Sequence, residues 1–272
     1  MIKIVVLSDL HIVPAGALSH GLDTTERLET GIDFVNSRHA DADLIVLAGD
    51  LADHGETAAY LRLQETISRF LVSPVLTLGN HDNSDRFVAQ FGAERVNQQT
   101  GKIDSVIDTN GHRVIVLDTS VPGQPGGRLQ EAQLQWLKQS LEAAEGRPVI
   151  IIMHHNLTPF GVPTDSIILE NGEAFAEIAR SCGSLRHVIG GHVHMSVSGS
   201  MMGVPFCTIA GGHYNIEPRL GKPTPTHGTE VVPRREGPGQ LAVVLSDEKA
   251  TVVHMENYID RHLVMAPDLF QK

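Results

Sequence analysis

The sequence predicts an α/β protein in which helices alternate with the strands of a buried sheet. Up to residue 195, short apolar runs alternate with segments whose apolar residues recur every three or four positions. This alternation is typical of βα units around a buried sheet. From Ser196 onward, apolar runs continue without helical segments between them. We therefore expect one α/β domain with a strand-rich C-terminal part.

The apolar runs predict strands, and apolar stripes with helical spacing predict the helices between them. We expect strands at 4–7, 44–48, 75–78, 114–117, 149–153, 187–189, 204–209, 241–245 and 250–254. The helical stripes are Leu28, Ile32 and Val35; Tyr60, Leu63, Ile67 and Phe70; Leu134, Leu137 and Leu141; and Phe175, Ile178 and Cys182. A shorter helix is expected over 84–90, and the Pro- and Gly-rich stretch 217–239 reads as a long loop.

Composition sets further limits on the protein. Of the 272 residues, 41% are hydrophobic and 19% are charged, which is enough apolar material for a substantial core. The formal charge of −11 argues against nucleic-acid binding through the general surface, because such binding needs clustered Lys and Arg. No apolar run reaches the length of a membrane span, so we expect a cytoplasmic protein. Cys182 and Cys207 are expected to be small buried thiols rather than a disulfide framework.

Metal-ligand side chains follow several predicted strands at the points where the strands end. Taken singly, a motif such as Asp9-Leu10-His11 is a common strand-end loop. In α/β sheets, however, the carboxyl ends of the strands line one crevice, so residues at these ends should converge. The residues in question are Asp9, His11, Asp50, Asn80, His81, Asp82, His154, His155, His192 and His194.

The residue types indicate a paired metal site. Carboxylate, imidazole and amide donors suit Zn, Mn or Fe, whereas thiolates suit soft metals. Seven of these residues are candidate ligands: Asp9, His11, Asp50, Asn80, His154, His192 and His194. Seven ligands are too many for one tetrahedral ion, but they suit two ions about 3.5–4 Å apart. Asp50 is the natural bridge, since a carboxylate has two oxygens to share. His192 and His194, two positions apart, should point the same way on an extended segment.

Together these motifs resemble the five-part signature of the calcineurin-like metallophosphoesterases. The parts are Asp9-Leu10-His11, Gly49-Asp50, Gly79-Asn80-His81-Asp82, Met153-His154-His155 and Gly191-His192-Val193-His194. The resemblance extends over residues 1–215 and is greatest to the bacterial class III cyclic-nucleotide and glycerophosphodiester phosphodiesterases. It implies a four-layer α-β-β-α sandwich of two mixed sheets flanked by helices.

The resemblance also implies a division of the chain and of its ligands. Residues 1–215 would be the catalytic core, and 216–272 a C-terminal loop and strands that complete the second sheet, with a cap or dimer surface left open. One ion would be held by Asp9, His11 and His194, the other by Asn80, His154 and His192, and Asp50 would lie between them. In the family pattern the first of two adjacent histidines is the ligand, which leaves His155 a supporting role.

The implied activity is hydrolysis of small phosphodiesters, either a 3′,5′-cyclic nucleotide or a glycerophosphodiester, by metal-activated hydroxide. Asp50 and His81 are the expected catalytic residues, and Asn80, His81, His194 and His213 the expected substrate-binding ones. A phosphomonoesterase or a nuclease would use the same two metal ions, although the acidity disfavours a nuclease. The expected partner is the small diester, with no membrane and no nucleic-acid polymer, and a homodimer or higher homo-oligomer stays open.

The roles of some neighbouring residues are left open between alternatives. His81 follows a ligand, and we expect it to protonate the leaving group or to bind a phosphoryl oxygen. Asp82 either orients the His81 imidazole or caps the helix over 84–90. His213 is either a substrate contact at the rim of the site or part of a polar turn, and His54 is a candidate supporting group.

The remaining polar residues of note are expected to lie at the surface. The basic residues of the long loop suit a subunit interface or plain solvation better than a pocket cover or an anionic-substrate contact; they are Arg219, Lys222, Arg234 and Arg235. The histidines expected to be ordinary surface groups are His20, His39, His112, His187, His254 and His262.

Overall fold

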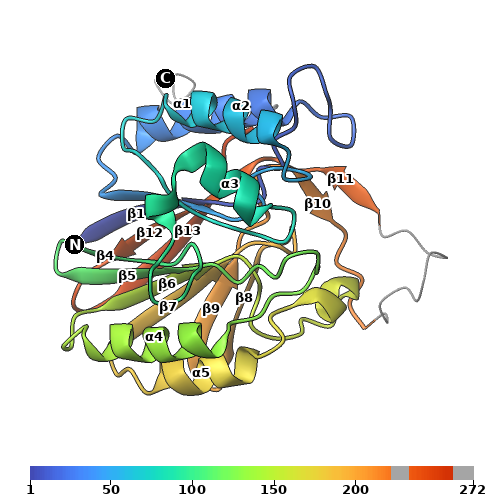
Figure 1. Cartoon of the computed structure of the whole chain (residues 1–272). Helices are drawn as coiled ribbons and strands as arrows, with labels where there is room; N and C mark the ends of the chain where they lie inside the picture. The colour runs from blue at the N-terminus through green and yellow to red at the C-terminus, as the bar shows by residue number, and fades with distance from the viewer. Residues whose placement is uncertain (222–232, 260–272) are drawn as a thin grey trace, which may run out of the picture.

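The computed structural model describes residues 1–221 and 233–259. Two mixed sheets pack face to face, and helices cover the outer face of each, so the fold is a four-layer α-β-β-α sandwich (Figure 1). This confirms the predicted fold class. Within the described ranges, no helix is both long enough and apolar enough to cross a membrane.

The first sheet has the strand order β13-β12-β1-β2-β3. Its parallel strands are β1 (Ile2–Leu7), β2 (Leu44–Ala48) and β3 (Val75–Thr77). Antiparallel to β1 runs β12 (Gln240–Ser246), followed by β13 (Thr251–Asn257) at the edge. The helices on this side are α1 (Thr24–Arg38), α2 (Thr57–Ile67) and α3 (Ser84–Phe91), with a short 3-10 turn, η1 (Ala93–Arg95), after them.

The second sheet has the order β4-β5-β6-β7-β9-β8. Its strands are β4 (Ser105–Thr109), β5 (His112–Leu117), β6 (Val149–Met153), β7 (Leu185–Gly190), β8 (Val197–Met201) and β9 (Val204–Thr208). Its outer face carries α4 (Glu131–Glu142) and α5 (Gly172–Arg180), and η2 (Pro163–Ile167) precedes α5. A separate two-stranded ribbon joins β10 (Tyr214–Ile216) to β11 (Arg234–Glu236).

Each central strand contributes to two apolar layers. One of its faces packs against the other sheet, and its other face packs against the helices. In β1, Ile2, Ile4 and Val6 face the other sheet, while Val5 and Leu7 face the helices. This division follows from the alternation of side chains along a strand. Because both faces are buried, such strands read as continuous apolar runs rather than alternating ones.

The predicted strands and helices agree with the structure where the chain is buried on both sides. The ranges 44–48 and 149–153 coincide with β2 and β6. Phe70 and Cys182 lie beyond the ends of their helices, although Phe70 still packs in the core. Four strands were not predicted, because each is an edge strand or part of the ribbon and carries polar residues; they are β4, β8, β10 and β11.

The C-terminal part differs from the expectation in two respects. We expected its strands to complete the second sheet, but β12 and β13 extend the sheet that contains β1. The stretch 217–239 is not wholly a loop, since β11 lies within it. The division of the chain at residue 215 stays a prediction. Among the cysteines, Cys207 is buried as expected, whereas Cys182 is only half-buried, and both are free thiols.

Candidate metal centre

The predicted ligand residues meet at the carboxyl ends of the central strands of both sheets. All of them are buried except Asn80, which is half-buried. The first sheet contributes Asp9, His11, Asp50 and Asn80, and the second contributes His154, His192 and His194. The edge where the two sheets lie against each other therefore carries a cluster drawn from both.

Distances within the cluster suit shared ions. His154 Nε2 lies 3.3 Å from Asp50 Oδ2 and 3.2 Å from Asn80 Oδ1. His11 Nε2 lies 3.6 Å from the same Asp50 oxygen and 3.3 Å from His194 Nε2. Two ligand atoms bound to one ion at about 2.1 Å each lie roughly 3.0–3.5 Å apart. The Asp50 carboxylate thus contacts a histidine of each ligand set.

Each ligand imidazole has its other ring nitrogen engaged by the protein. The Nδ1 atoms of His154 and His194 lie 3.0 Å from Ala48 O and 2.7 Å from Tyr214 O. His192 is turned the other way, because its Nε2 lies 2.8 Å from Ile167 O, which leaves Nδ1 for an ion. Such outer contacts fix the tautomer and orientation of metal-binding histidines.

Five of the ligands have left-handed backbone, which is uncommon outside glycine. Their φ angles are 55° for Asp9, 48° for His11, 50° for Asp50, 71° for His192 and 50° for His194. Each such residue costs about 1–3 kcal/mol and is retained where the surroundings require it. His192 and His194 are therefore placed by successive tight turns, so our expectation of an extended segment is wrong.

Two glycines make room for the ligands. A Cβ on Gly79 would collide with Asp50 Oδ1, and one on Gly191 would collide with Ser8 Oγ and lie 2.6 Å from Asp9 Oδ2. The glycines in these two motifs are thus required by close approach of the ligands.

The charges in the cluster favour a cation. Burial opposes ionisation of Asp50, but the charges of His154 and His11 hold the pKa of Asp50 well below its ordinary value. Burial would lower the pKa of His154, yet Asp50 raises it to about 9. Burial lowers the pKa of His192 to about 3 and of His194 to about 4. The ionised Asp50 and the neutral His192 and His194 are thus in the forms that bind metal ions, whereas a metal ion would have to displace the proton of His154.

His81 is half-buried beside the cluster and is held from both sides. Its backbone N–H donates to Asp50 Oδ1 at 2.9 Å, and its Nδ1 lies 2.6 Å from Asp53 O. Burial would lower its pKa, but Asp50 and the bond to Asp53 raise it above the ordinary value. With Nδ1 engaged by a carbonyl, Nε2 is the ring atom left to act on a substrate.

Asp53 also belongs to the site, although the sequence did not predict it. Its Oδ1 lies 3.0 Å from His11 Nδ1 and 3.9 Å from His81 Nδ1, so one carboxylate supports both imidazoles. Its position three residues after Asp50 is the only signal that the sequence offers. His54, the candidate supporting group, has an exposed ring 3.5 Å from Asp53 Oδ2.

Asp82 has neither of its two expected roles. Asn83 caps α3, and its side chain accepts from the N–H of Arg86. The Asp82 carboxylate instead accepts from the N–H groups of Gly79, Leu51 and Ala52, at 2.9, 3.1 and 3.0 Å. Burial, then the charge of Asp50, raises the pKa of Asp82 to about 6. Its function is therefore to tie the Asn80 loop to the Asp50 loop.

His155 and His213 are buried next to the ligands His154 and His11. Both ring nitrogens of His155 have protein partners, Thr119 Oγ1 at 2.7 Å and Pro125 O at 3.3 Å, so no ring nitrogen is left for an ion. His213 is fully buried, 4.9 Å from His11 between ring centroids, with Nε2 3.2 Å from Ser19 O. It is buried rather than exposed at a rim, and it lies in the bend that precedes β10.

The other histidines follow the expectation only in part. His20 and His254 are exposed and His187 is half-buried, but His39 and His112 are buried. His39 Nε2 lies 3.4 Å from Glu256 Oε2, and His112 Nε2 lies 3.1 Å from Ser246 Oγ. His262 and Lys222 fall outside the described residues.

The comparison with known families agrees with this cluster. A model of the calcineurin-like phosphoesterase family matches residues 2–196. The chain belongs to this family. It is accordingly a hydrolase of the metallophosphoesterase class, and the matched range contains every predicted ligand.

Relatives within the family are named for diester hydrolysis. The chain is 33% identical to a probable cyclic nucleotide phosphodiesterase of Rhodopseudomonas palustris, over 75% of this chain and 76% of that protein. It is 30% identical to a 3′,5′-cyclic adenosine monophosphate phosphodiesterase of Pseudomonas aeruginosa, over 71% and 70%. A probable glycerophosphodiester phosphodiesterase of Arcobacter nitrofigilis is 28% identical, over 70% and 71%.

Solved structures support the fold. A dimetal phosphatase from Danio rerio superimposes with a TM-score of 0.66, covering 95% of this chain and 97% of that one. Its sequence identity is 16%, so the likeness concerns the fold alone.

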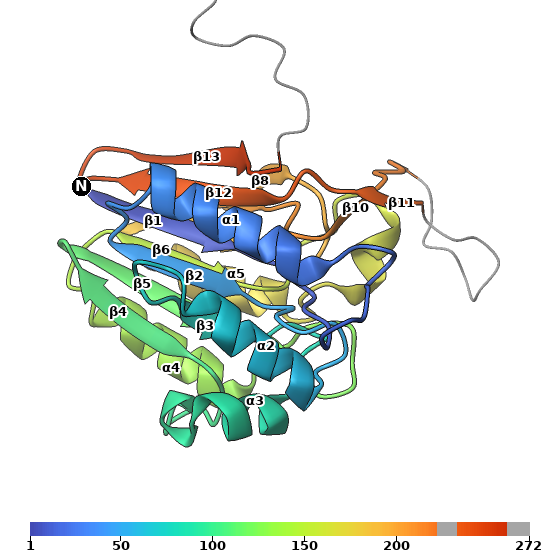
Figure 2. The same ribbon diagram turned by 90° about the horizontal axis from the view of Figure 1, so that it is seen from above.

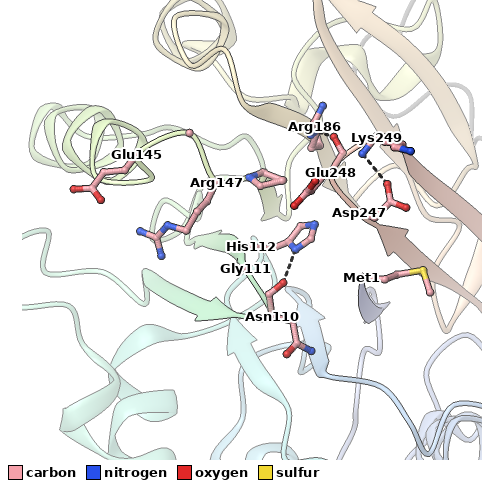
Figure 3. Close-up of a pocket in the computed structure, with 12 residues that line it drawn as sticks. Met1, Asn110, Gly111, His112, Glu145, Arg147, Arg186, Asp247, Glu248 and Lys249 are labelled. Carbon is pink, nitrogen blue, oxygen red and sulfur yellow. Dashed lines mark hydrogen bonds between the residues drawn. The ribbon is translucent and has the colours of Figure 1, made fainter.

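Figure 3 shows a pocket of about 740 Å³. Its lining includes Met1, His112 and Pro148 at the amino ends of β1, β5 and β6, so it lies at the opposite end of the strands from the ligand cluster. The two arginines that line it already have partners within the protein. Arg147 Nη1 lies 2.9 Å from Asp108 Oδ2, and Arg186 Nη2 donates to Glu248 O at 2.8 Å. None of the predicted ligands lines it, so the chemistry belongs to the carboxyl ends of the strands.

We predict that Tyr60→Phe destabilises the protein by about 1–3 kcal/mol. The buried Tyr60 hydroxyl donates to Asp82 Oδ1 at 3.0 Å and accepts from Asn83 N at 2.8 Å, so its removal leaves a backbone N–H without a partner. The free energy of unfolding in urea, at equal metal content, measures the loss.

Tyr258→Phe is the matched control, because the buried Tyr258 hydroxyl has no hydrogen-bond partner among the described residues. We expect this variant to be neutral or slightly more stable than the wild type. Equal losses in the two variants would contradict the role given to the bond between Tyr60 and Asp82.

Proposed function

We propose that the chain is a binuclear metal-dependent phosphodiesterase that hydrolyses small diesters, a 3′,5′-cyclic nucleotide or a glycerophosphodiester. The observation that carries the proposal is the position of Asp50 between the two ligand sets. One Asp50 oxygen lies 3.6 Å from His11 Nε2 and 3.3 Å from His154 Nε2. The names of the relatives supply the diester class.

The donors fit two ions with Asp50 shared between them. Asp9, His11 and His194 would hold one ion, since their ligand atoms and those of Asp50 all lie within 4.8 Å of one another. Asn80, His154 and His192 would hold the other. Nitrogen and oxygen donors of this kind suit Fe, Mn or Zn. When bound, such ions lower the pKa of water and neutralise charge on a phosphate.

The chain's own residues orient the diester and supply a proton. His81 has Nδ1 anchored on the Asp53 carbonyl, so the ring presents Nε2 to the substrate side. Its raised pKa keeps a larger fraction of the imidazole protonated near neutrality. We assign Nε2–H to the leaving oxygen or to a phosphoryl oxygen, and the Asn80 amide to both the ion and the substrate.

A substrate panel tests the proposed function directly. We expect the metal-loaded enzyme to turn over cyclic AMP, glycerophosphoethanolamine or bis-p-nitrophenyl phosphate with a higher kcat/KM than p-nitrophenyl phosphate. Monoester turnover far above that of every diester would overturn the assignment.

Replacing Asp50 tests the bridge. We expect Asp50→Ala to bind at least one ion fewer than the wild type, because both ligand sets lose a shared carboxylate. Elemental analysis of the folded protein counts the ions. Asp85→Ala, an exposed carboxylate in α3, serves as the control and should keep full occupancy. Two ions retained in Asp50→Ala would rule out bridging.

Replacing His81 separates proton transfer from metal binding. We expect His81→Ala to keep its metal content and to lose about 10²–10⁴-fold in kcat on diesters with poor leaving groups. The loss should be smaller with p-nitrophenolate, which leaves without protonation. His254→Ala, on the exposed face of β13, is the control. A fall of metal content in step with the rate would assign His81 to the structure of the site instead.

A further inference from the structure

The β10–β11 ribbon places an arginine beside the metal cluster. Tyr214 pairs with Glu236, and Ile216 pairs with Arg234, so these four side chains share one face of the ribbon. Asn215 and Arg235 occupy the other face. Figure 2 shows the ribbon beyond the carboxyl end of β1, where the ligands lie.

Tyr214 joins this face to the cluster. Its ring lies parallel to that of His194, with 4.1 Å between centroids and 3° between planes. Its carbonyl accepts from Nδ1 of the same histidine at 2.7 Å. The guanidinium of Arg234 lies 4.8 Å from the centroid of the Tyr214 ring. Because His194 occupies one face of the ring, the guanidinium covers the other.

His20 meets the edge of the same ring. Its imidazole lies 5.0 Å from Tyr214, at 81°, and 5.7 Å from His213. His20 has a left-handed φ of 48° and is exposed, like Arg234. After burial, the charge of Arg234 is the next cause that lowers the pKa of His20, so the two groups are near each other.

Within the described part of the chain, the Tyr214 ring is the partner of the Arg234 guanidinium, and no carboxylate neutralises its charge. No carboxylate of residues 1–221 or 233–259 forms an ion pair with it, although Glu236 lies on the same ribbon face. The Glu236 carboxylate turns instead to Arg27 of α1, with 3.0 Å between Oε1 and Nη1. Arg27 also donates to the carbonyls of Gly212, His213 and Gly237, which fixes the ribbon against the helix.

We propose that the exposed planes of His20 and Arg234, both packed against the buried Tyr214 ring, form a subsite for the base of a cyclic nucleotide, which deepens and rests on the proposed diester hydrolysis. Exposed guanidinium and imidazole planes around a tyrosine provide stacking and cation–π surfaces for a nucleobase. A glycerol or ethanolamine group has no planar face to use them. The subsite therefore selects cyclic nucleotides over glycerophosphodiesters.

The test compares two substrates in one variant. We expect Arg234→Ala to raise KM for cyclic AMP about tenfold with kcat unchanged, since base stacking is worth about 1–3 kcal/mol. KM for glycerophosphoethanolamine should stay within about twofold. Arg234→Lys keeps the charge without the plane and should recover only part of the loss. His20→Asn should also raise KM for cyclic AMP, and asparagine is chosen because it tolerates the left-handed backbone at this position.

Arg235→Ala is the control, because it removes the same charge one residue away on the opposite ribbon face. We expect it to leave both KM values unchanged. An equal rise for the two substrates in Arg234→Ala, no rise for cyclic AMP, or the same rise in Arg235→Ala would each overturn the subsite.

A binding measurement keeps this test separate from the proposed function. If the wild type turns over no diester, the proposed function fails, and the subsite is then judged on the metal-loaded protein by calorimetry. AMP should bind more tightly than ribose 5-phosphate, and Arg234→Ala should abolish the difference. Equal binding of the two ligands by the wild type would reject the subsite.

Discussion

The alignment of the two sheets at their carboxyl ends depends on the contacts that Asp50 makes across the junction between them. Asp50 follows β2 of the first sheet, and its carboxylate meets His154, which follows β6 of the second. It also accepts from the N–H of His81 at 2.9 Å. These contacts fix how the carboxyl ends of the two sheets meet, because a shift of one sheet would separate the donors of one ligand set from those of the other.

Bringing these groups together is costly, and the surrounding hydrogen bonds offset the cost. Burial raises the pKa of Asp9, and five ligands have left-handed backbone. In return, the Asp9 carboxylate accepts from the N–H of His192 at 3.0 Å, and Asp82 accepts from three backbone N–H groups. A strained, desolvated cluster of this kind is typical of sites that are completed by cations. The apolar layers hold the sheets together, while the polar bonds set the positions of the donors.

The sequence predicts well that the candidate ligands converge, because they follow strands with clear apolar runs and the strand ends share one edge. The sequence predicts poorly the role of a side chain whose hydrogen-bond partners are backbone groups. Asp82 was assigned to a cap or to His81, whereas its partners are N–H groups that no sequence pattern shows. His192 and His194 were expected on an extended segment, and their turns were not foreseen because left-handed histidines have no signal of their own. Edge strands such as β4 and β8 were not predicted, because one side of each faces solvent and their residues are polar.

The residues proposed for the reaction and those proposed for substrate specificity lie in different parts of the fold. The candidate ligands come from strand ends in the core of the fold, and their nitrogen and oxygen donors suit the paired ions proposed above. The proposed base subsite lies outside the core, and Arg234 belongs to a ribbon whose strands are formed by residues 214–216 and 234–236. Their face is set by pairing register, since a slip of one residue would exchange Arg234 for Arg235. Arg27 opposes such a slip by binding Glu236 and the carbonyls of Gly212, His213 and Gly237. A residue of α1 thus helps to hold the register that places Arg234 over Tyr214.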